Sequence, residues 1–267
     1  MKCPCISVAI LAALFLFSFA GPLFYGVSPY DLHPDALLMP PSWHHPLGTD
    51  RLGRDLLARL MQGGQVSLVI GVGSALIAAF IGLIVGITAG YFRGGVDKAF
   101  VIVVDLFLTF PTFFLLLALV SYVEASVWVL IFVISVTGWM TMARMIRAES
   151  FAIAQKPFVK ILKIAHVPTL KIILKYFAPL LAPIFFVSFT FGVGGAILSE
   201  SALSFLGLGI SPPQMSWGSL ISEGKEVMEI AWWISFFPGL MIFFVTFSLM
   251  QISDYLQTRT NRKEIVT

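Results

Sequence analysis

Six long apolar stretches constrain the fold of this chain more than any other feature of its sequence. Each holds about 20 residues, which as an α-helix rising about 1.5 Å per residue would cross the roughly 30 Å hydrocarbon core of a bilayer. Of the 267 residues, 58% are hydrophobic and 12% are charged, and a water-soluble domain of this length could not bury so much apolar surface. The stretches are residues 6–24, 66–91, 99–120, 126–143, 176–198 and 231–252. We therefore predict an all-α, polytopic membrane protein with six transmembrane helices.

The distribution of lysine and arginine orients these spans. If the N-terminus is cytoplasmic, 13 of the 17 basic residues lie in segments on the inner side. The outer segments then hold the other four, Arg51, Arg54, Arg59 and Lys225. Because cytoplasmic loops usually carry an excess of Lys and Arg, we expect both termini to be cytoplasmic. The net charge is only +3 and the basic residues are dispersed, which is not the pattern of a nucleic-acid-binding protein.

The spans divide the chain into a first transmembrane helix (1–24), an outer segment (25–65), a core transmembrane domain (66–258) and a cytoplasmic tail (259–267). The first helix has a second interpretation, because Lys2, an apolar run and Ser18-Phe19-Ala20 resemble a cleavable secretory signal. We favour a retained helix, since the chain that follows is itself an integral membrane protein. Measuring the intact mass of the mature protein distinguishes the two.

The outer segment contains five prolines between residues 29 and 46, so its first half should be extended or turned. Asp50 is suited to cap a short amphipathic helix that follows it. His44 and His45 are adjacent, which raises the question of a metal site. With no third ligand nearby in the sequence, we interpret them as solvated or hydrogen-bonded and predict no metal site.

Few polar groups fall within the spans. Asp105 lies among apolar residues and stands alone in the sequence, so it would serve either an ion or proton relay or, as we favour, a structural hydrogen bond. Span five contains Gly194 and Gly195 and continues to Glu200. Glycines of this kind fit a helix that bends along a translocation pathway, although ordinary packing would also use them. We take these four residues as pathway candidates.

A cytoplasmic stretch, residues 144–175, is too long for a simple turn between spans four and five. Pro157 and Pro168 enclose a predicted helix of about ten residues, 158–167, with one apolar face and several basic residues. Such a helix could dock into a groove of a cytoplasmic partner. It could equally lie on anionic lipid, and the pattern alone does not separate these interpretations.

Motifs of catalysis are missing from the sequence. It contains no Gly-x-x-x-x-Gly-Lys-Ser/Thr phosphate loop, no His-Glu-x-x-His and no Gly-x-Ser-x-Gly. We therefore predict no catalytic residues, no ATP site and no cofactor in this chain.

Several ordered motifs resemble one known family. His45-Pro46-Leu47-Gly48-Thr49-Asp50 is followed by Gly53-Arg54-Asp55 and Ser67-Leu68. Farther along come Phe110-Pro111, Ala143-Arg144, the run 204–209, Pro212-Pro213, Ser216-Trp217-Gly218 and Phe237-Pro238-Gly239-Leu240. Together they are similar to the dipeptide, oligopeptide and nickel permease subunits of ATP-binding-cassette (ABC) importers, over most of the chain.

The resemblance implies a type I ABC importer permease fold in a bacterial inner membrane. It implies a second permease subunit, two ATPase subunits that carry ATP and Mg, and an extracytoplasmic substrate-binding protein. The helix near residues 156–168 would be the coupling helix that seats in an ATPase groove. Its expected ATPase contacts are Phe158, Val159, Lys160, Lys163 and His166. The residues expected to order the outer segment are Gly48, Asp50, Gly53, Arg54 and Asp55.

Two positions depart from the family's coupling motif. Lys160 occupies the position of a usual Glu, and His166 occupies that of a usual Gly. Because Lys160 reverses a charge at the expected interface, the partner ATPase would need a compensating acid. The substrate implied first is a di- or oligopeptide, and nickel or a nickel chelate is the alternative. The rival class is a stand-alone channel or secondary transporter, for which the spans offer little ionisable material.

Overall fold

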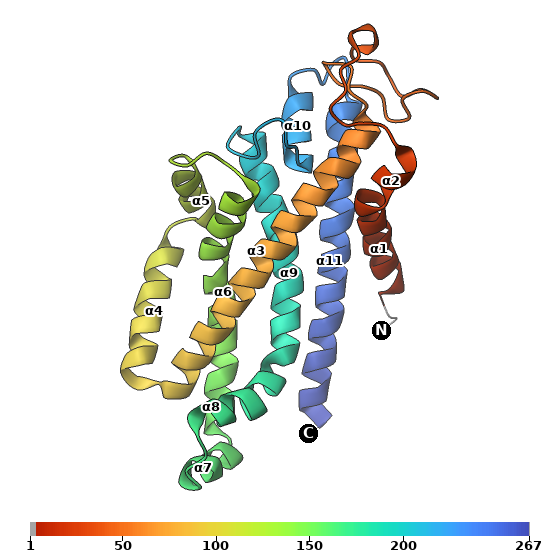
Figure 1. Ribbon diagram of the computed structural model, residues 1–267. Helices are drawn as coiled ribbons and strands as arrows, with labels where there is room; N and C mark the ends of the chain where they lie inside the picture. The colour runs from red at the N-terminus through yellow and green to blue at the C-terminus, as the bar shows by residue number, and fades with distance from the viewer. Residues whose placement is uncertain (1–3, 267) are drawn as a thin grey trace.

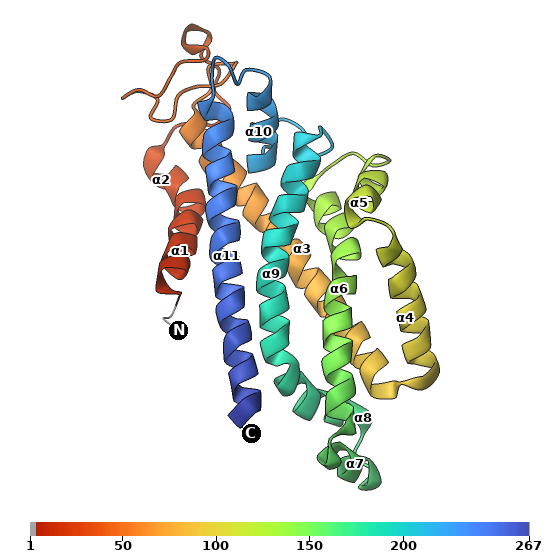
Figure 2. The ribbon, with the colours of Figure 1, turned by 180° about the vertical axis from the view of Figure 1, so that it is seen from behind.

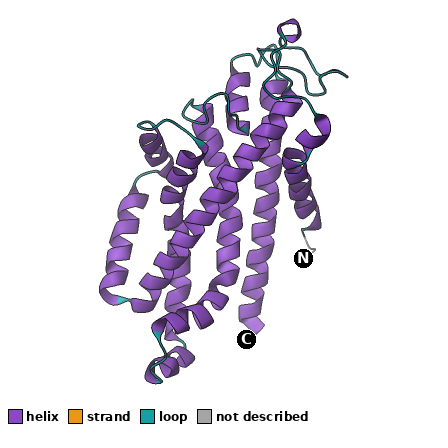
Figure 3. Ribbon diagram, viewed as in Figure 1, coloured by secondary structure: helices purple, strands orange, loops and turns teal. Residues whose placement is uncertain are grey.

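The computed structural model describes residues 4–266, and the side chains of residues 4–259. Within this part helices dominate and no strand is formed (Figure 3). The expected tail, 259–267, therefore falls largely outside the described side chains, as does Lys2. The helices are α1 (Cys5–Phe19), α2 (Gly21–Tyr25), the 3-10 turn η1 (Pro34–Ala36), α3 (Leu56–Phe92), α4 (Gly94–Thr109), α5 (Thr112–Val120), α6 (Val127–Gln155), α7 (Pro157–Ile164), α8 (Thr169–Ile172), the π-helical turn η2 (Ile173–Phe177), α9 (Ala178–Phe205), α10 (Trp217–Lys225) and α11 (Trp233–Val266).

Among the described residues, four helical segments are long and apolar enough to cross a membrane: Leu56–Phe92, Val127–Gln155, Thr169–Phe205 and Trp233–Arg259. The multi-pass, all-α prediction is confirmed, but the count of six is not reproduced in full. The predicted third span is a pair of helices, α4 and α5, bent by 80°. The predicted first span is reduced to the 15 residues of α1, about 22 Å of helix, followed by the separate short α2.

The bend between α4 and α5 occurs at Phe110-Pro111. Proline has no N–H to continue a helix and disfavours helical backbone in the residue before it. Phe110 accordingly lies at φ −84° and ψ 134°, in the extended region. The sequence contains this signal, although the span predicted over residues 99–120 runs across it without a break.

Helix α3 begins at Leu56, earlier than the span predicted from Val66. Its N-cap is Asp55, whose carboxylate accepts a hydrogen bond from the Ala58 N–H at 3.0 Å. Asp50, the cap expected from the sequence, instead accepts the backbone N–H groups of Leu52 and Arg54 and closes the turn before the helix. The short amphipathic helix is therefore the first part of α3 itself.

The long α3 crosses α6 and α9 obliquely. Helices α11 and α1 follow beyond α9, on the side away from α6 (Figures 1 and 2). A row of small residues makes the contact with α6 possible. A Cβ atom on Gly86 would lie 2.8 Å from the Ala143 carbonyl oxygen, and one on Gly90 would lie 2.7 Å from that of Arg147. Close helix packing through small residues is common in membrane proteins.

The bundle has two different ends. The loops before α3, together with α2, η1 and α10, gather at one end, which we call the outer end (Figure 1). Helices α7 and α8 and the end of α11 lie at the opposite, inner end. The outer end holds the motif residues Gly48, Asp50, Gly53, Arg54 and Asp55, and the inner end holds the predicted coupling helix.

Candidate functional site

Helix α7 at the inner end is the candidate coupling helix. It begins with Pro157 at its first position, where a proline costs no hydrogen bond, and ends at Ile164. Two backbone bonds close it, from the Val167 N–H to the Leu162 carbonyl and from the His166 N–H to the Lys163 carbonyl. This is a Schellman motif, which requires a left-handed residue at the position of His166. His166 indeed has φ +54°.

The turn at His166 ends the helix before the predicted residue 167. It also explains why glycine is usual in the family at this position, since left-handed backbone is least strained in glycine. Histidine is among the non-glycine residues that tolerate the conformation.

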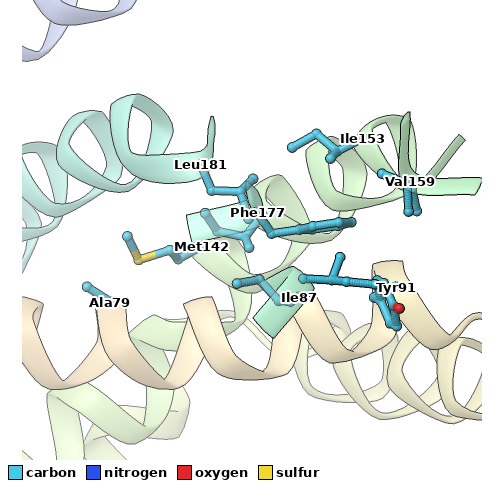
Figure 4. Close-up of a cluster of buried hydrophobic side chains, with 11 residues drawn as sticks. Ala79, Ile87, Tyr91, Met142, Ile153, Val159, Phe177 and Leu181 are labelled. Carbon is cyan, nitrogen blue, oxygen red and sulfur yellow. The ribbon is translucent and has the colours of Figure 1, made fainter. Parts of the chain in front are cut away.

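Val159 anchors α7 to the rest of the protein. Its side chain is 0% exposed and lies in an apolar cluster with Tyr91, Ile153 and Phe177 (Figure 4). The expectation that Val159 contacts an ATPase is therefore wrong for this structure, because the side chain is buried within its own chain. Successive residues of a helix point in different directions around its axis, so Val159 faces the bundle while Ile161 and Ile164 face outward.

The outward side of α7 carries apolar and basic side chains. Ile161 is 64% exposed and Ile164 is 78% exposed, and Lys160 is exposed beside them. Lys163 is also exposed, with its Nζ 4.4 Å from the ring centroid of Tyr91. Phe158 is only partly buried. Ile161 and Ile164 form an apolar patch that no other described part of the chain covers, at the tip of the molecule. Such a patch is typical of an interaction surface.

A buried ionic cluster orders the outer end, and we call Asp50, Arg54, Arg59 and Glu223 the outer ionic cluster. Arg59, on the first turns of α3, is 2% exposed and binds both Asp50 and Glu223, the latter at 2.6 and 2.9 Å. Arg54 binds Asp50 through its Nε at 2.6 Å and reaches Glu223 at 3.3 Å. The cluster joins the loop before α3 to α10, since Glu223 lies on α10.

Asp55 is shared among three parts of the outer end. Besides capping α3, its carboxylate accepts a hydrogen bond from the Tyr25 hydroxyl at 3.1 Å and lies 3.0 Å from His45 Nδ1. Burial, followed by the charge of Asp55 and this hydrogen bond, raises the pKa of Tyr25 to about 12. His45 is thus a hydrogen-bonded residue of the motif.

The two motif glycines are required by their surroundings. Gly48 has φ +83°, and a Cβ atom there would lie 2.7 Å from both the Met39 carbonyl oxygen and Trp233 Nε1. Gly53 has φ +74°, and a Cβ atom there would overlap the His33 carbonyl oxygen at 1.9 Å. The predicted ordering residues Gly48, Asp50, Gly53, Arg54 and Asp55 therefore all come together in one folded segment. Sequence reasoning left out their partners Arg59 and Glu223.

Glu200 does not line an open pathway in this structure. It is 0% exposed and accepts hydrogen bonds from Ser204 at 2.7 Å and from Ser67 at 3.3 Å. Ser67 in turn accepts the Trp217 N–H at 3.1 Å. The carboxyl group thereby links α9, α3 and the start of α10, and its surroundings are closed. This corrects the prediction of Glu200 as a pathway residue for the conformation described.

Asp105 has a partner that the sequence reading missed. Its carboxylate binds Arg144, and a second ion pair joins Asp97 to Arg147, with one contact at 2.7 Å. Both pairs connect α4 to α6. The predicted loop 144–175 includes Arg144 and Arg147, but α6 continues without a break to Gln155 and brings both arginines beside α4. The statement that Asp105 stands alone is therefore wrong.

A cavity of about 460 Å³ lies among α3, α5, α6, α9 and the inner part of α11. Gly195, one of the pathway candidates, lines it. Gly194 does not; it faces α11, where a Cβ atom would lie at ordinary contact distance, 3.9 Å, from Leu249.

Comparisons with known proteins show which family the chain belongs to. Residues 82–262 match the family model described as binding-protein-dependent transport system inner membrane component. The chain is 33% identical over 260 residues to the oligopeptide transport system permease protein OppC of Haemophilus influenzae, covering 97% of this chain and 84% of that protein. It is 36% identical over 238 residues to OppC of Mycobacterium tuberculosis, covering 88% and 82%. With the dipeptide transport system permease protein DppC of Bacillus subtilis it shares 34% identity over 258 residues, covering 95% and 80%.

A solved structure has a similar fold. It is a chain of the MetNI methionine ABC transporter in an inward facing conformation, with a TM-score of 0.57 over 74% of this chain and 95% of that one. The sequence identity is 15%, so this likeness concerns the fold alone.

Proposed function

Because this chain belongs to the family of inner membrane components of binding-protein-dependent transport systems, we propose that it is the permease subunit through which an ABC importer carries di- and oligopeptides into the cell. The observation that carries the peptide assignment is the similarity to OppC and DppC permeases along more than four fifths of this chain. None of the relatives named above is a nickel permease, so peptide is preferred to nickel. The protein is a multi-pass membrane protein, and we place both termini in the cytoplasm of a bacterial cell, with α10 and the outer ionic cluster outside.

We propose that α7 couples this chain to an ATPase subunit. The support is its position at the inner end, its two exposed isoleucines and its firm attachment through Val159. An amphipathic helix that presents apolar residues at its tip fits the mode in which a helix docks into a groove. Ile161 and Ile164 would make the apolar contact, with Phe158, Lys160, Lys163 and His166 around it.

The remaining partners follow from this role. Two ATPase subunits would bind ATP and Mg, a second permease subunit would complete the pathway, and an extracytoplasmic binding protein would deliver the peptide to the outer end. This chain would supply no catalytic group of its own. Lys160 is exposed and free to face an acid on the ATPase. If Lys160→Glu improved assembly with the native ATPases, this charge-compensation hypothesis would be wrong.

Transport by the complete complex tests the proposal. The complex, reconstituted in liposomes with its binding protein, should take up a labelled tripeptide only when ATP is present. A single cysteine introduced by Ile164→Cys should cross-link to the ATPase in the same functioning complex. Uptake by this chain alone without nucleotide would favour the rival class, a channel or secondary transporter. A functional complex in which α7 never cross-links to an ATPase would contradict the coupling role.

A further inference from the structure

The cavity among α3, α5, α6, α9 and α11 has the size of a small-molecule site. Its volume of about 460 Å³ lies within the roughly 300–1,000 Å³ that such sites occupy. Its walls are mostly apolar. Gly195 on α9 faces open space, since a Cβ atom there would have no neighbour within 4 Å.

Several hydroxyl groups on the walls lack partners. Ser74 is 1% exposed, and its Oγ forms no hydrogen bond within the described residues. Thr112 and Thr141, which are exposed, and Ser199, which is half-buried, also line the cavity, and no hydrogen bond of their hydroxyls is found among the described residues. A buried hydroxyl is normally paired, so a molecule in the cavity is expected to supply the missing partner of Ser74.

The cavity also contains a charged group. Among its described lining residues, Asp254 on α11 is the one ionisable group. It forms no ion pair with any described side chain, in contrast to Asp50, Asp97 and Asp105. Asp254 lies in the C-terminal half of α11, the half that runs to the inner end of the bundle and away from the outer ionic cluster (Figure 1). A free carboxylate at this position attracts a cationic group and repels anions.

We propose that this cavity binds a short peptide on its way through the protein, with Asp254 receiving the peptide's α-ammonium group. The hydroxyls of Ser74, Thr141 and Ser199 donate and accept hydrogen bonds, as the amide groups of a peptide main chain require. The apolar walls accept side chains of different kinds without selecting among them. A metal ion is a poorer occupant, because no group of three His, Cys, Asp or Glu side chains is found in the described part of the chain.

This inference rests on the proposed peptide transport and deepens it, so its test must separate the two. Binding of labelled Ala-Phe-Ala is measured on the complete, detergent-solubilised complex without nucleotide and without the binding protein. Asp254→Asn should weaken binding about tenfold, since a hydrogen bond between charged groups is lost. N-acetyl-Ala-Phe-Ala, which has no ammonium, should bind the wild type and Asp254→Asn equally. The matched control is Glu149→Gln, an acid on α6 outside the cavity, which should bind both peptides as the wild type does.

A second variant tests the cavity independently of its charge. Gly195→Leu should fill the open space next to α9 and abolish binding of both peptides, while leucine is readily accommodated in a helix. ATP hydrolysis by the complex verifies that the variant is assembled. If the Asp254→Asn and Gly195→Leu complexes bind and transport peptide like the wild type, the cavity proposal is overturned while peptide transport stands. In that case a side chain of the second permease subunit would fill the cavity. If the wild-type complex transports no peptide, the proposed function itself fails.

Discussion

The outer and inner ends of this protein are held together by different forces. At the outer end, Arg59 is buried between Asp50 and Glu223, and the charges are satisfied within the chain. At the inner end, α7 is attached by an apolar cluster around Val159, while Ile161 and Ile164 remain uncovered. The ion pairs of the outer end are therefore formed within the isolated chain, whereas α7 presents apolar side chains that a partner would cover. Substitutions at the two ends should accordingly affect different properties.

The largest effect is expected from Arg59→Ala. Removing this guanidinium would leave Arg54 alone to balance the carboxylates of Asp50 and Glu223, and losing one partner of the buried Asp50 typically costs about 3–5 kcal/mol. Thermal unfolding of the purified chain in detergent should show a clear loss of stability. Arg51→Ala, which removes an exposed ion pair with Glu226, is the matched control and should change stability little. Equal effects of the two variants would mean that the outer ionic cluster does not hold the outer end.

Val159→Ala should have the next largest effect. It removes buried methyl groups from the cluster with Phe177 and leaves a cavity, which together should cost about 2 kcal/mol. The same unfolding measurement checks it. Ile161→Ala, an apolar truncation on the exposed side of the same helix, should leave the stability of the isolated chain unchanged. If Val159→Ala were as neutral as Ile161→Ala, the attachment of α7 would have to lie elsewhere.

Ile164→Ser separates assembly from stability. The side chain is 78% exposed, so its loss should not destabilise the isolated chain. Affinity for the ATPase subunits, measured by co-purification or titration, should fall about tenfold if this residue is central to the interface. Lost affinity with unchanged unfolding would sharpen the contrast between the two ends, and unchanged affinity would contradict docking through this patch.

His166→Gly should have the smallest effect, and it should be favourable. His166 has φ +54°, where residues with a Cβ atom are strained by about 1 kcal/mol relative to glycine. The unfolding temperature should therefore rise slightly. His166→Val, with a branched Cβ in the same conformation, should instead lower it. A loss of stability in the glycine variant would show that the histidine side chain contributes contacts that outweigh the strain.

Much of the fold could be predicted because the bilayer imposes it. Apolar runs of spanning length indicated the multi-pass helical protein, and Pro111 marked the place where α4 and α5 are broken, although we did not predict the bend. Gly48 and Gly53 could be recognised as motif positions. Their physical reason, the contact with Met39, Trp233 and His33, required the structure.

The polar partners could not be predicted, because they are distant in the sequence. Arg59 and Glu223 are 164 residues apart, and Ser67 and Glu200 are 133 apart. Asp105 and Arg144 are closer, at 39 residues, but an error in the end of α6 was enough to hide their pairing. The sequence did not predict that the Val159 side chain points into the bundle, because a short amphipathic pattern does not show which face of the helix packs against the rest of the protein.

The sequence by itself determined that this chain lies in a membrane as helices, where prolines and glycines interrupt them, and which family it resembles. These properties depend on local quantities: the length of an apolar run, the backbone of proline and glycine, and the order of motifs. Only the tertiary structure decided which charges neutralise each other, which face of α7 is free and where a cavity remains, because these depend on contacts between helices whose separation along the chain carries no information about their distance in space.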